Sequence, residues 1–257
     1  NIMQQENGEK IVKRAFQDAW DAFSKDKPEL FYFDGNKFCL VIKSIQTIGK
    51  TEYELYIGKG QNENYFISSF KSQQEVEQAI SDLENKKSQI ISTIKKDDNE
   101  YTYSYEKILQ IHDWLIENVS YDTEMQYTNN TNIYGAISEG NAICEAYAET
   151  FKYLMDELEV PCIFVCGEGK DEDTNKQEKH AWNYVYIGGN WYAIDTTWDD
   201  PVINTSNNIQ IIPNSVKYKY FLKGSGRMQK THIPTGEVIE GGKVFEYPEL
   251  NEKDFEI

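Results

Sequence analysis

Three residues in the second half of the chain have the types and spacing that cysteine-based acyl transfer requires. Cys144 follows a Gly-Asn loop and opens the run CEAYAETFKYLMDEL, which is rich in helix formers. His180 begins HAWNYVYI, and Asp195 lies near the end of WYAIDTTW, with GGN between the two segments. Because Gly-Gly-Asn is a strong hairpin signal, these segments are predicted to be adjacent antiparallel strands. The hairpin would bring the imidazole and the carboxylate together.

This combination suits thiolate chemistry. A thiol with a reference pKa of about 8.5 is mostly protonated at neutral pH, and both a helix N-terminus and an imidazolium stabilise its anion. Cys144 is predicted to have the first, and His180 would supply the second. A carboxylate on the far ring nitrogen fixes the tautomer and stabilises the charged ring, which is the role predicted for Asp195. The three residues therefore predict a catalytic triad.

The elements that position these residues follow from the periodicity of the sequence. A helix beginning at Cys144 is predicted, followed by a strand in PCIFVCGEG, the polar loop KDEDTNKQEK and the two strands of the hairpin. Upstream, Ser72 and Glu75 form a capping-box signature before a helix that runs to about Lys95. The polar link KKDDNE then precedes a helix in YEKILQIHDWLIENVSYD. Apolar residues at helical spacing mark the Cys144 helix: Ala146, Tyr147, Phe151, Leu154, Met155 and Leu158.

The first 71 residues have a different pattern. An amphipathic helix is predicted from about Ile11 to Phe23, and Pro28 ends it. FYFDGNKFCLVI carries an Asp-Gly turn between strand-like runs, and TEYELYIG and NYFISSF alternate in the same way. We therefore predict a small helix-plus-sheet module over residues 1–71 and a catalytic domain over residues 72–257.

Composition excludes several classes of function. The net charge of -17 repels phosphate backbones and anionic membranes, so nucleic acid is not an expected partner. The sequence contains no apolar stretch of the roughly 20 residues that a membrane-spanning helix needs. Four cysteines are too few for a disulfide framework that stabilises a chain of 257 residues. Cys162 and Cys166 would also lie too far apart on one strand to form a disulfide with each other. Three scattered His residues also make a metal site improbable, and no cofactor is expected.

Three segments together resemble the transglutaminase-like superfamily, with its papain-like Cys, His, Asp order. They are GNAICEAYAETFKYLMDELEVPC, HAWNYVYIGGNWYAIDTTWDDP and the upstream IHDWLIENVSYD, and YKYFLKGSGRMQKTH is similar to the downstream part of bacterial members. The resemblance covers roughly residues 72–232. It implies an α+β papain-like core, in which a catalytic helix packs on an antiparallel sheet. It also implies that Cys144 is the nucleophile, His180 the base and Asp195 the orienting acid.

One departure from the family pattern is visible, because Ala146 stands where members usually have Gly in CEGYA. Ala favours the helix and adds one methyl group, so the change should be tolerated. By the same resemblance His232 could approach the cleft, although a structural role is favoured for it. His112 and Asp113 lie in the middle of a helix, and the turn residues Asp199 and Asp200 precede Pro201. We place none of these in the site.

Other site residues are weaker predictions. The backbone N–H of Cys144 is a natural donor to a tetrahedral oxyanion, and Tyr134 or Asn141 is the expected second donor, unless these two residues hold the loop. Trp182 and Trp198 are predicted to lie in the core or in the wall of the cleft.

The predicted function is acyl transfer on amide bonds of a protein or peptide substrate. With water as acceptor the protein is a peptidase or amidase, and this is favoured because the loops expected around the cleft are polar. With a lysine amine it is a transglutaminase, and a surface binding protein with a vestigial triad is a third possibility. The start NIMQQENGEK and the Asn-, Lys- and Ile-rich composition suggest an exported or surface protein of a bacterium, with a cytoplasmic location as the alternative.

Overall fold

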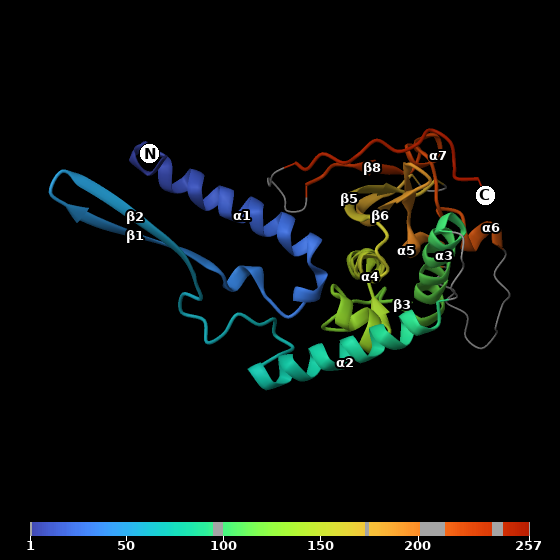
Figure 1. Cartoon of the computed structure of the whole chain (residues 1–257), viewed down its shortest axis with the longest axis horizontal. Coiled ribbons are helices and arrows are strands. Elements are labelled where there is room, and N and C mark those ends of the chain that lie inside the picture. Colours follow the sequence, from blue (N-terminus) through green and yellow to red (C-terminus); the bar gives the residue numbers. More distant parts are fainter. Residues whose placement is uncertain (1, 95–99, 173–174, 201–213, 238–243, 257) are drawn as a thin grey trace.

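The computed structural model describes residues 2–94, 100–172, 175–200, 214–237 and 244–256. Its centre is a sheet of four antiparallel strands in the order β7-β6-β5-β8. Figure 1 shows helix α4 beneath this sheet, with α2 and α3 on the other sides of α4. The strands of the sheet are β5 (Cys162–Lys170), β6 (Gln177–Ile187), β7 (Asn190–Ile194) and β8 (His232–Pro234).

The hairpin between β6 and β7 forms where Gly-Gly-Asn predicts it. Ile187 pairs with Asn190, and Gly188 and Gly189 have φ angles of 60° and 84°. Two positive φ values in a two-residue turn suit glycine and match the twist of the flanking strands. The second strand ends earlier than predicted, because the side chain of Asp195 caps the short helix α5 (Thr196–Asp199). The prediction of a strand continuing to Trp198 is therefore wrong.

Helix α4 (Cys144–Glu157) is the most deeply buried helix among the described residues. It packs against α3 (Glu100–Asn118) and the sheet, and Tyr147, Phe151 and Leu154 have no exposed surface. Burial of several large side chains at about 1.5–3 kcal/mol each stabilises the position of α4. Cys144 at its first turn therefore sits on a rigid element.

Helix α2 (Gln73–Ser92) begins with the predicted cap. The Glu75 backbone N–H donates to Ser72 Oγ at 3.2 Å, while the Glu75 carboxylate accepts from the N–H of Lys71 at 2.7 Å instead of returning to Ser72. Residues 95–99 of the predicted polar link lie outside the described residues. Short elements complete the described chain: β3 (Ser120–Tyr121), β4 (Asn141–Ala142), α6 (Asn214–Lys217), α7 (Ser225–Met228), 3-10 turns at Ile2–Gln4, Pro28–Leu30 and Gly35–Lys37, and a π turn at Gly135–Glu139.

The N-terminal segment has fewer strands than predicted. Helix α1 (Gly8–Asp26) is present, but the sheet contains only β1 (Cys39–Thr47) and β2 (Lys50–Gly58). Asp34 does not form a hairpin turn, because its side chain accepts the N–H of Asn36 and caps a 3-10 turn. The segment NYFISSF contributes one bridge, Phe33 to Phe66, and no strand.

Two aromatic residues connect this segment to the main core. Figure 1 shows the β1–β2 hairpin and the start of α1 projecting away from the rest of the molecule. Phe31 and Phe70, however, are only 7% and 8% exposed and belong to the main core. The ring of Phe31 stacks on Tyr134 with centroids 5.6 Å apart. The N-terminal segment is thus anchored at the end that lies near α4.

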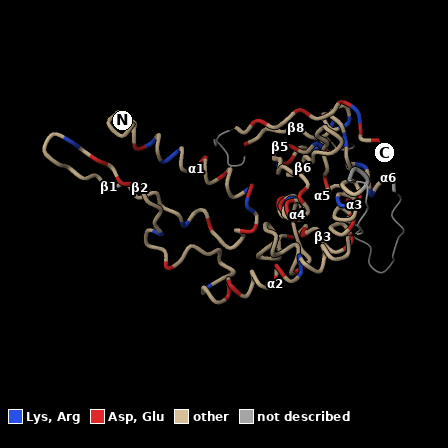
Figure 2. The backbone as a smooth tube through the Cα atoms, in the orientation of Figure 1, with Lys and Arg blue, Asp and Glu red and all other residues tan. Residues whose placement is uncertain are grey.

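Charged residues are spread along the described chain and do not gather on a single element (Figure 2). Acidic residues outnumber basic ones, 43 to 26, in the sequence. Among the described residues, none of the helices combines the length and apolar character needed to cross a membrane.

Candidate active site

Cys144 is the first residue of α4, and its side chain is half-buried. The preceding residue, Ile143, is extended at φ -107° and ψ 178° and caps α4 without a side-chain hydrogen bond. The Ile143 N–H donates to the carbonyl of Asn130 at 2.8 Å, which holds the chain before the helix. The thiol therefore lies at the positive end of a helix dipole, where a negative charge is stabilised.

His180 connects the thiol to a carboxylate. Its Nε2 lies 2.7 Å from Oδ2 of Asp195, which leaves Nδ1 for the Cys144 thiol, whose interaction with the ring helps to raise the pKa of His180. The ring is 4% exposed. Burial alone would lower the pKa of His180, but the charge of Asp195 and the interactions with Asp195 and Cys144 raise it to about 10. This arrangement favours an imidazolium beside the thiol.

Asp195 is fully buried and accepts four hydrogen bonds. Its Oδ1 accepts the backbone N–H groups of Thr197 and Trp198 at 3.0 and 3.1 Å. Its Oδ2 faces His180 and also Nε2 of His232, at 2.9 Å. Burial would raise the pKa of Asp195, but the two rings hold it well below its usual range. The carboxylate stays charged at every pH near neutrality.

His232 is an additional member of this buried group. Its Nδ1 lies 2.8 Å from Oγ1 of Thr231, so both ring nitrogens are engaged. The favoured structural role for His232 therefore includes a contact with the predicted triad. The register of the sheet makes this possible, because β8 lies beside β5 and brings His232 opposite Gly169. No local sequence signal marks that pairing.

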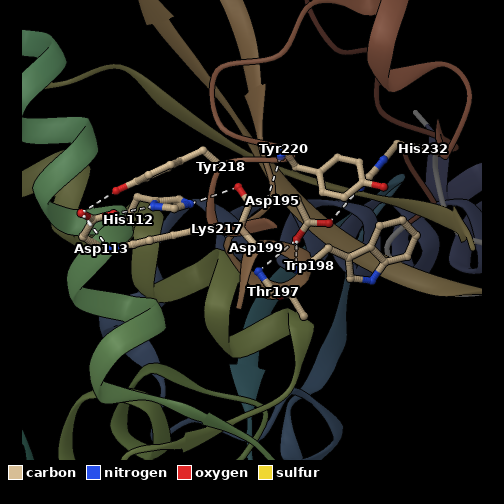
Figure 3. A network of polar contacts seen from close by, with 10 residues as sticks. All are labelled: His112, Asp113, Asp195, Thr197, Trp198, Asp199, Lys217, Tyr218, Tyr220 and His232. Carbon is tan, nitrogen blue, oxygen red and sulfur yellow. Dashed lines mark hydrogen bonds and ion pairs between the residues drawn. The ribbon is translucent and has the colours of Figure 1, made fainter. Parts of the chain in front are cut away.

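A second network lies on the other side of α5. His112 of α3 is fully buried, and its Nε2 lies 3.1 Å from Oδ2 of Asp199. Asp199 Oδ1 accepts the backbone N–H of Tyr220 at 2.8 Å. Figure 3 shows Asp199 between His112 and Tyr220, and Asp195 turned toward His232. His112 has satisfied partners outside the candidate site, as its position in the sequence predicts, and Pro201 lies outside the described residues.

The thiol opens onto a pocket of about 320 Å³. Its charged lining comes from Lys25 of α1, Glu145 of α4, Glu168 of β5, Lys179 of β6, and Glu237. Apolar lining includes Phe164, Ile143 and Ala181, together with the second thiol of Cys166. The lining of the pocket therefore combines apolar and charged side chains.

Trp182 and Trp198 do not line this pocket. Trp198 stacks on the ring of His180 with centroids 4.7 Å apart, and Trp182 packs edge-on to His232 at 4.9 Å. Trp182 is two residues from His180 on β6, so the two side chains share one face of the strand. His232 and Trp198 cover that face, and both indoles therefore lie behind the imidazole. They exclude water from the histidines, and the expectation that they could form the cleft wall is corrected.

The two predicted oxyanion residues are engaged elsewhere. The ring of Tyr134 lies among Phe31 and Phe70, and the charges that raise the pKa of its hydroxyl, after burial, are those of Asp82 and Glu139. The side-chain amide of Asn141 donates to the carbonyl of Glu139 at 2.8 Å. Both residues hold the loop before α4, which was the alternative interpretation of the sequence.

Tyr121 is the residue that sequence reasoning missed. The parallel pairing of β3 and β4 places Tyr121 beside Ala142, two positions before the thiol. Burial, with the charge of Cys144, raises the pKa of Tyr121 to about 12, and the backbone of Cys144 opposes this rise. The neutral phenol group of Tyr121 thus lies close to the backbone N–H of Cys144, which is the predicted oxyanion donor. The only signal was the Tyr-Asp pair after the upstream helix, which does not reveal its distant partner.

Three possible metal ligands lie together, because one ligand atom from each of His180, Asp195 and His232 falls within 4.8 Å of the other two. Both rings direct Nε2 at the same carboxylate oxygen, at 2.7 and 2.9 Å. An ion would have to replace these buried hydrogen bonds, so we assign the group to hydrogen bonding.

Comparison with known proteins finds a family that part of the chain resembles. Residues 89–196 match the family model of the transglutaminase-like superfamily. This part of the chain is similar to that superfamily, and the predicted α+β fold class and family resemblance are both confirmed.

Curated relatives include the kyphoscoliosis peptidases of Mus musculus and Homo sapiens, which are 24% and 23% identical over 139 residues. Each match covers 50% of this chain and 21% of the relative, so the chain spans about a fifth of their length. Among solved structures, a TGase is 15% identical with a TM-score of 0.36, covering 74% of this chain and 53% of its own. A structure from Cytophaga hutchinsonii described as a candidate cysteine protease is 17% identical with a TM-score of 0.35, covering 65% of this chain and 68% of its own.

Proposed function

We propose that the protein is a cysteine-dependent acyl-transfer enzyme that hydrolyses amide bonds of proteins or peptides. The observation that carries this proposal is the connected line from Cys144 through His180 to the buried Asp195. A thiol at a helix N-terminus, an imidazole in contact with it and a carboxylate on the far ring nitrogen form the activated-nucleophile arrangement.

In the first half of the proposed reaction, the Cys144 thiolate attacks the carbonyl carbon of the amide. The oxyanion that forms lies near the backbone N–H of Cys144 and the hydroxyl of Tyr121, which are suited to donate to it. His180 gives its Nδ1 proton to the leaving amine as the C–N bond breaks, and a thioester remains on Cys144.

In the second half, water attacks the thioester while His180 removes its proton. The C–S bond breaks, the carboxylic acid leaves, and the thiolate and imidazolium return. Asp195 keeps its charge throughout, because its four hydrogen bonds stabilise the carboxylate. Water is the proposed acceptor because five charged side chains line the pocket and make it readily hydrated. Water at tens of molar then outcompetes a dilute amine.

The test offers the protein an unfolded glutamine-containing protein and a labelled primary amine in the same reaction. Peptide cleavage and conversion of glutamine to glutamate report hydrolysis, whereas incorporation of the label reports transamidation. We expect hydrolysis in the wild type and none in Cys144→Ala or His180→Ala, with both variants folded. Label incorporation at a rate comparable to hydrolysis would replace the hydrolase by a transglutaminase.

A surface binding protein with a vestigial triad predicts a different result. Its Cys144 would react with iodoacetamide only at the alkaline pH typical of an ordinary thiol, whereas an activated thiolate reacts at mildly acid pH.

Export to the surface of a bacterium remains a prediction from composition. Fractionation of the source cells with an antibody against the protein tests it.

A further inference from the structure

Lys25 brings the N-terminal helix to the candidate active site. It is the next-to-last residue of α1, and its ammonium bonds to the carboxylates of Glu145 and Glu149 in the first two turns of α4. The bond to Glu149 measures 2.6 Å. The same nitrogen lies 5.1 Å from the ring centroid of Phe164, which lines the pocket that holds Cys144. Helix α1 therefore contributes a side chain to this pocket.

The ammonium of Lys25 is held as a cation by its ion pairs with Glu145 and Glu149. The side chain of Lys25 is 18% exposed, and that of Glu149 is 8% exposed. Burial would lower the pKa of Lys25, but Glu149 and Glu145 hold it well above its usual range. Burial raises the pKa of Glu149 to about 7, although the charge of Lys25 opposes this. The group thus carries one positive and up to two negative charges close to the start of α4.

The position of Glu145 means that these charges act on the Cys144 thiol. Glu145 directly follows Cys144, and a carboxylate near a thiol disfavours the thiolate. The positive charge of Lys25 lies between the two carboxylates and offsets them. Without Lys25, the helix N-terminus that should stabilise an anion would carry uncompensated negative charge.

We propose that Lys25 is a positioning residue of the active site, supplied by the N-terminal helix. It forms one side of the pocket and neutralises the acidic first turns of α4, so that Cys144 can ionise beside His180. This inference rests on the proposed function. It also gives residues 1–71 a role in the site, although their sequence pattern suggests a separate module.

Several other charged or titratable groups surround the thiol, and the variants below leave them unchanged. They are Tyr121 of β3, Glu168 of β5, Glu178, Lys179 and His180 of β6, Asp195, and Glu237 after β8. A change of reactivity can therefore be assigned to the Lys25 group.

The experiment measures the rate at which iodoacetamide alkylates Cys144, between about pH 5 and pH 9, which spans the range where a thiol and an imidazole titrate. Peptide mass spectrometry separates Cys144 from Cys39 and Cys166. We expect Lys25→Met to lower the rate at mildly acid pH by about threefold, because the carboxylates near the thiol are then no longer offset. Lys25→Arg should stay close to wild type, and Glu145→Gln should react faster. Lys25→Met with Glu145→Gln should return toward the wild-type rate.

The outcomes separate this inference from the proposed function. If wild-type Cys144 reacts at acid pH and Lys25→Met reacts equally fast, the inference is overturned and the proposed function stands. If wild-type Cys144 lacks acid-pH reactivity, the proposed function fails. Circular dichroism and thermal unfolding check each variant. Should Lys25→Met not fold, Glu145→Gln alone decides, because general damage slows alkylation whereas the inference requires it to rise. An unchanged or slower Glu145→Gln would refute the inference.

Discussion

Replacing Asp195 by Asn tests the charge at the centre of the candidate site. The side chains have nearly the same shape, but Asn carries no charge and offers one oxygen instead of two. In the wild type, Oδ2 faces His180 at 2.7 Å and His232 at 2.9 Å, and Oδ1 caps α5. An amide cannot satisfy all of these donors. We expect Asp195→Asn to fold but to leave His180 largely neutral.

The size of the effect follows from His180. Its pKa of about 10 compares with an ordinary value of 6.5. At about 1.4 kcal/mol per pKa unit, the surroundings favour the imidazolium by roughly 5 kcal/mol. The charge of Asp195 is the largest contribution that raises the pKa of His180, and it opposes the lowering by burial. Losing half of this energy lowers the proton affinity of the His180 ring by about 50-fold, and removing the charge of the corresponding Asp in other triads costs about 10⁴-fold in turnover.

The assay combines turnover with alkylation of Cys144 as a function of pH. Asp199→Asn is the matched control, because Asp199 is equally buried and lies in the same short helix but bonds to His112 and Tyr220. Burial raises the pKa of Asp199 to about 6, so an amide resembles its protonated form. We expect Asp199→Asn to alter stability while Cys144 remains reactive at acid pH.

The reasoning is refuted if Asp195→Asn keeps wild-type alkylation at acid pH and wild-type turnover. It is also refuted if Asp199→Asn reduces thiol reactivity as strongly, because the effect would then belong to the fold around α5 and not to the charge on His180.

Three further predictions concern neighbouring groups. Tyr121→Phe should lower kcat by about 10- to 100-fold with little change in KM, since its hydroxyl would act on the oxyanion; steady-state kinetics measure this. His232→Leu should lower turnover about tenfold, because it removes one hydrogen-bond donor from Asp195. His232→Gln keeps a donor, so it should restore most of the turnover and the wild-type dependence of turnover on acid pH. Glu149 has a pKa of about 7 in the fold against an ordinary 4.5, so between these values the folded chain binds more protons than the unfolded chain. Its contribution to stability therefore falls as pH rises through that window. Glu149→Gln should flatten the pH dependence of the free energy of unfolding in this window, measured by urea unfolding at each pH.

Local patterns in the sequence were sufficient to predict the central elements. The apolar stripe on one side of α4 and the Gly-Gly turn between β6 and β7 are determined within short segments, and both lie where predicted. The juxtaposition of His180 and Asp195 follows from hairpin register alone, because the two residues are 15 apart along the chain. Local geometry therefore suffices for two members of the candidate triad.

Contacts between distant segments could not be predicted in this way. Tyr121 reaches Cys144 through a parallel pair of two-residue strands, and His232 reaches Asp195 across 37 residues. Lys25 reaches Glu145 across 120 residues. These contacts depend on how whole elements pack, and no spacing rule encodes them. Around Asp34, a local side-chain bond to Asn36 replaced the expected hairpin turn, which shows that turn chemistry can mislead where strand propensity is high.

The carboxylate of Asp195 serves the fold and the candidate chemistry at the same time. Oδ1 accepts the N–H groups of Thr197 and Trp198, so the start of α5 fixes the orientation of the side chain. Oδ2 is thereby aimed at His180 before any substrate arrives. Because the same turn ends at Asp199, which binds His112 of α3, while Asp195 binds His232, the position of α5 is held by two buried acid–histidine pairs (Figure 3). A preorganised dipole costs no reorganisation during reaction. The buried polar network around α5 is therefore best explained as a rigid support for the charge on His180.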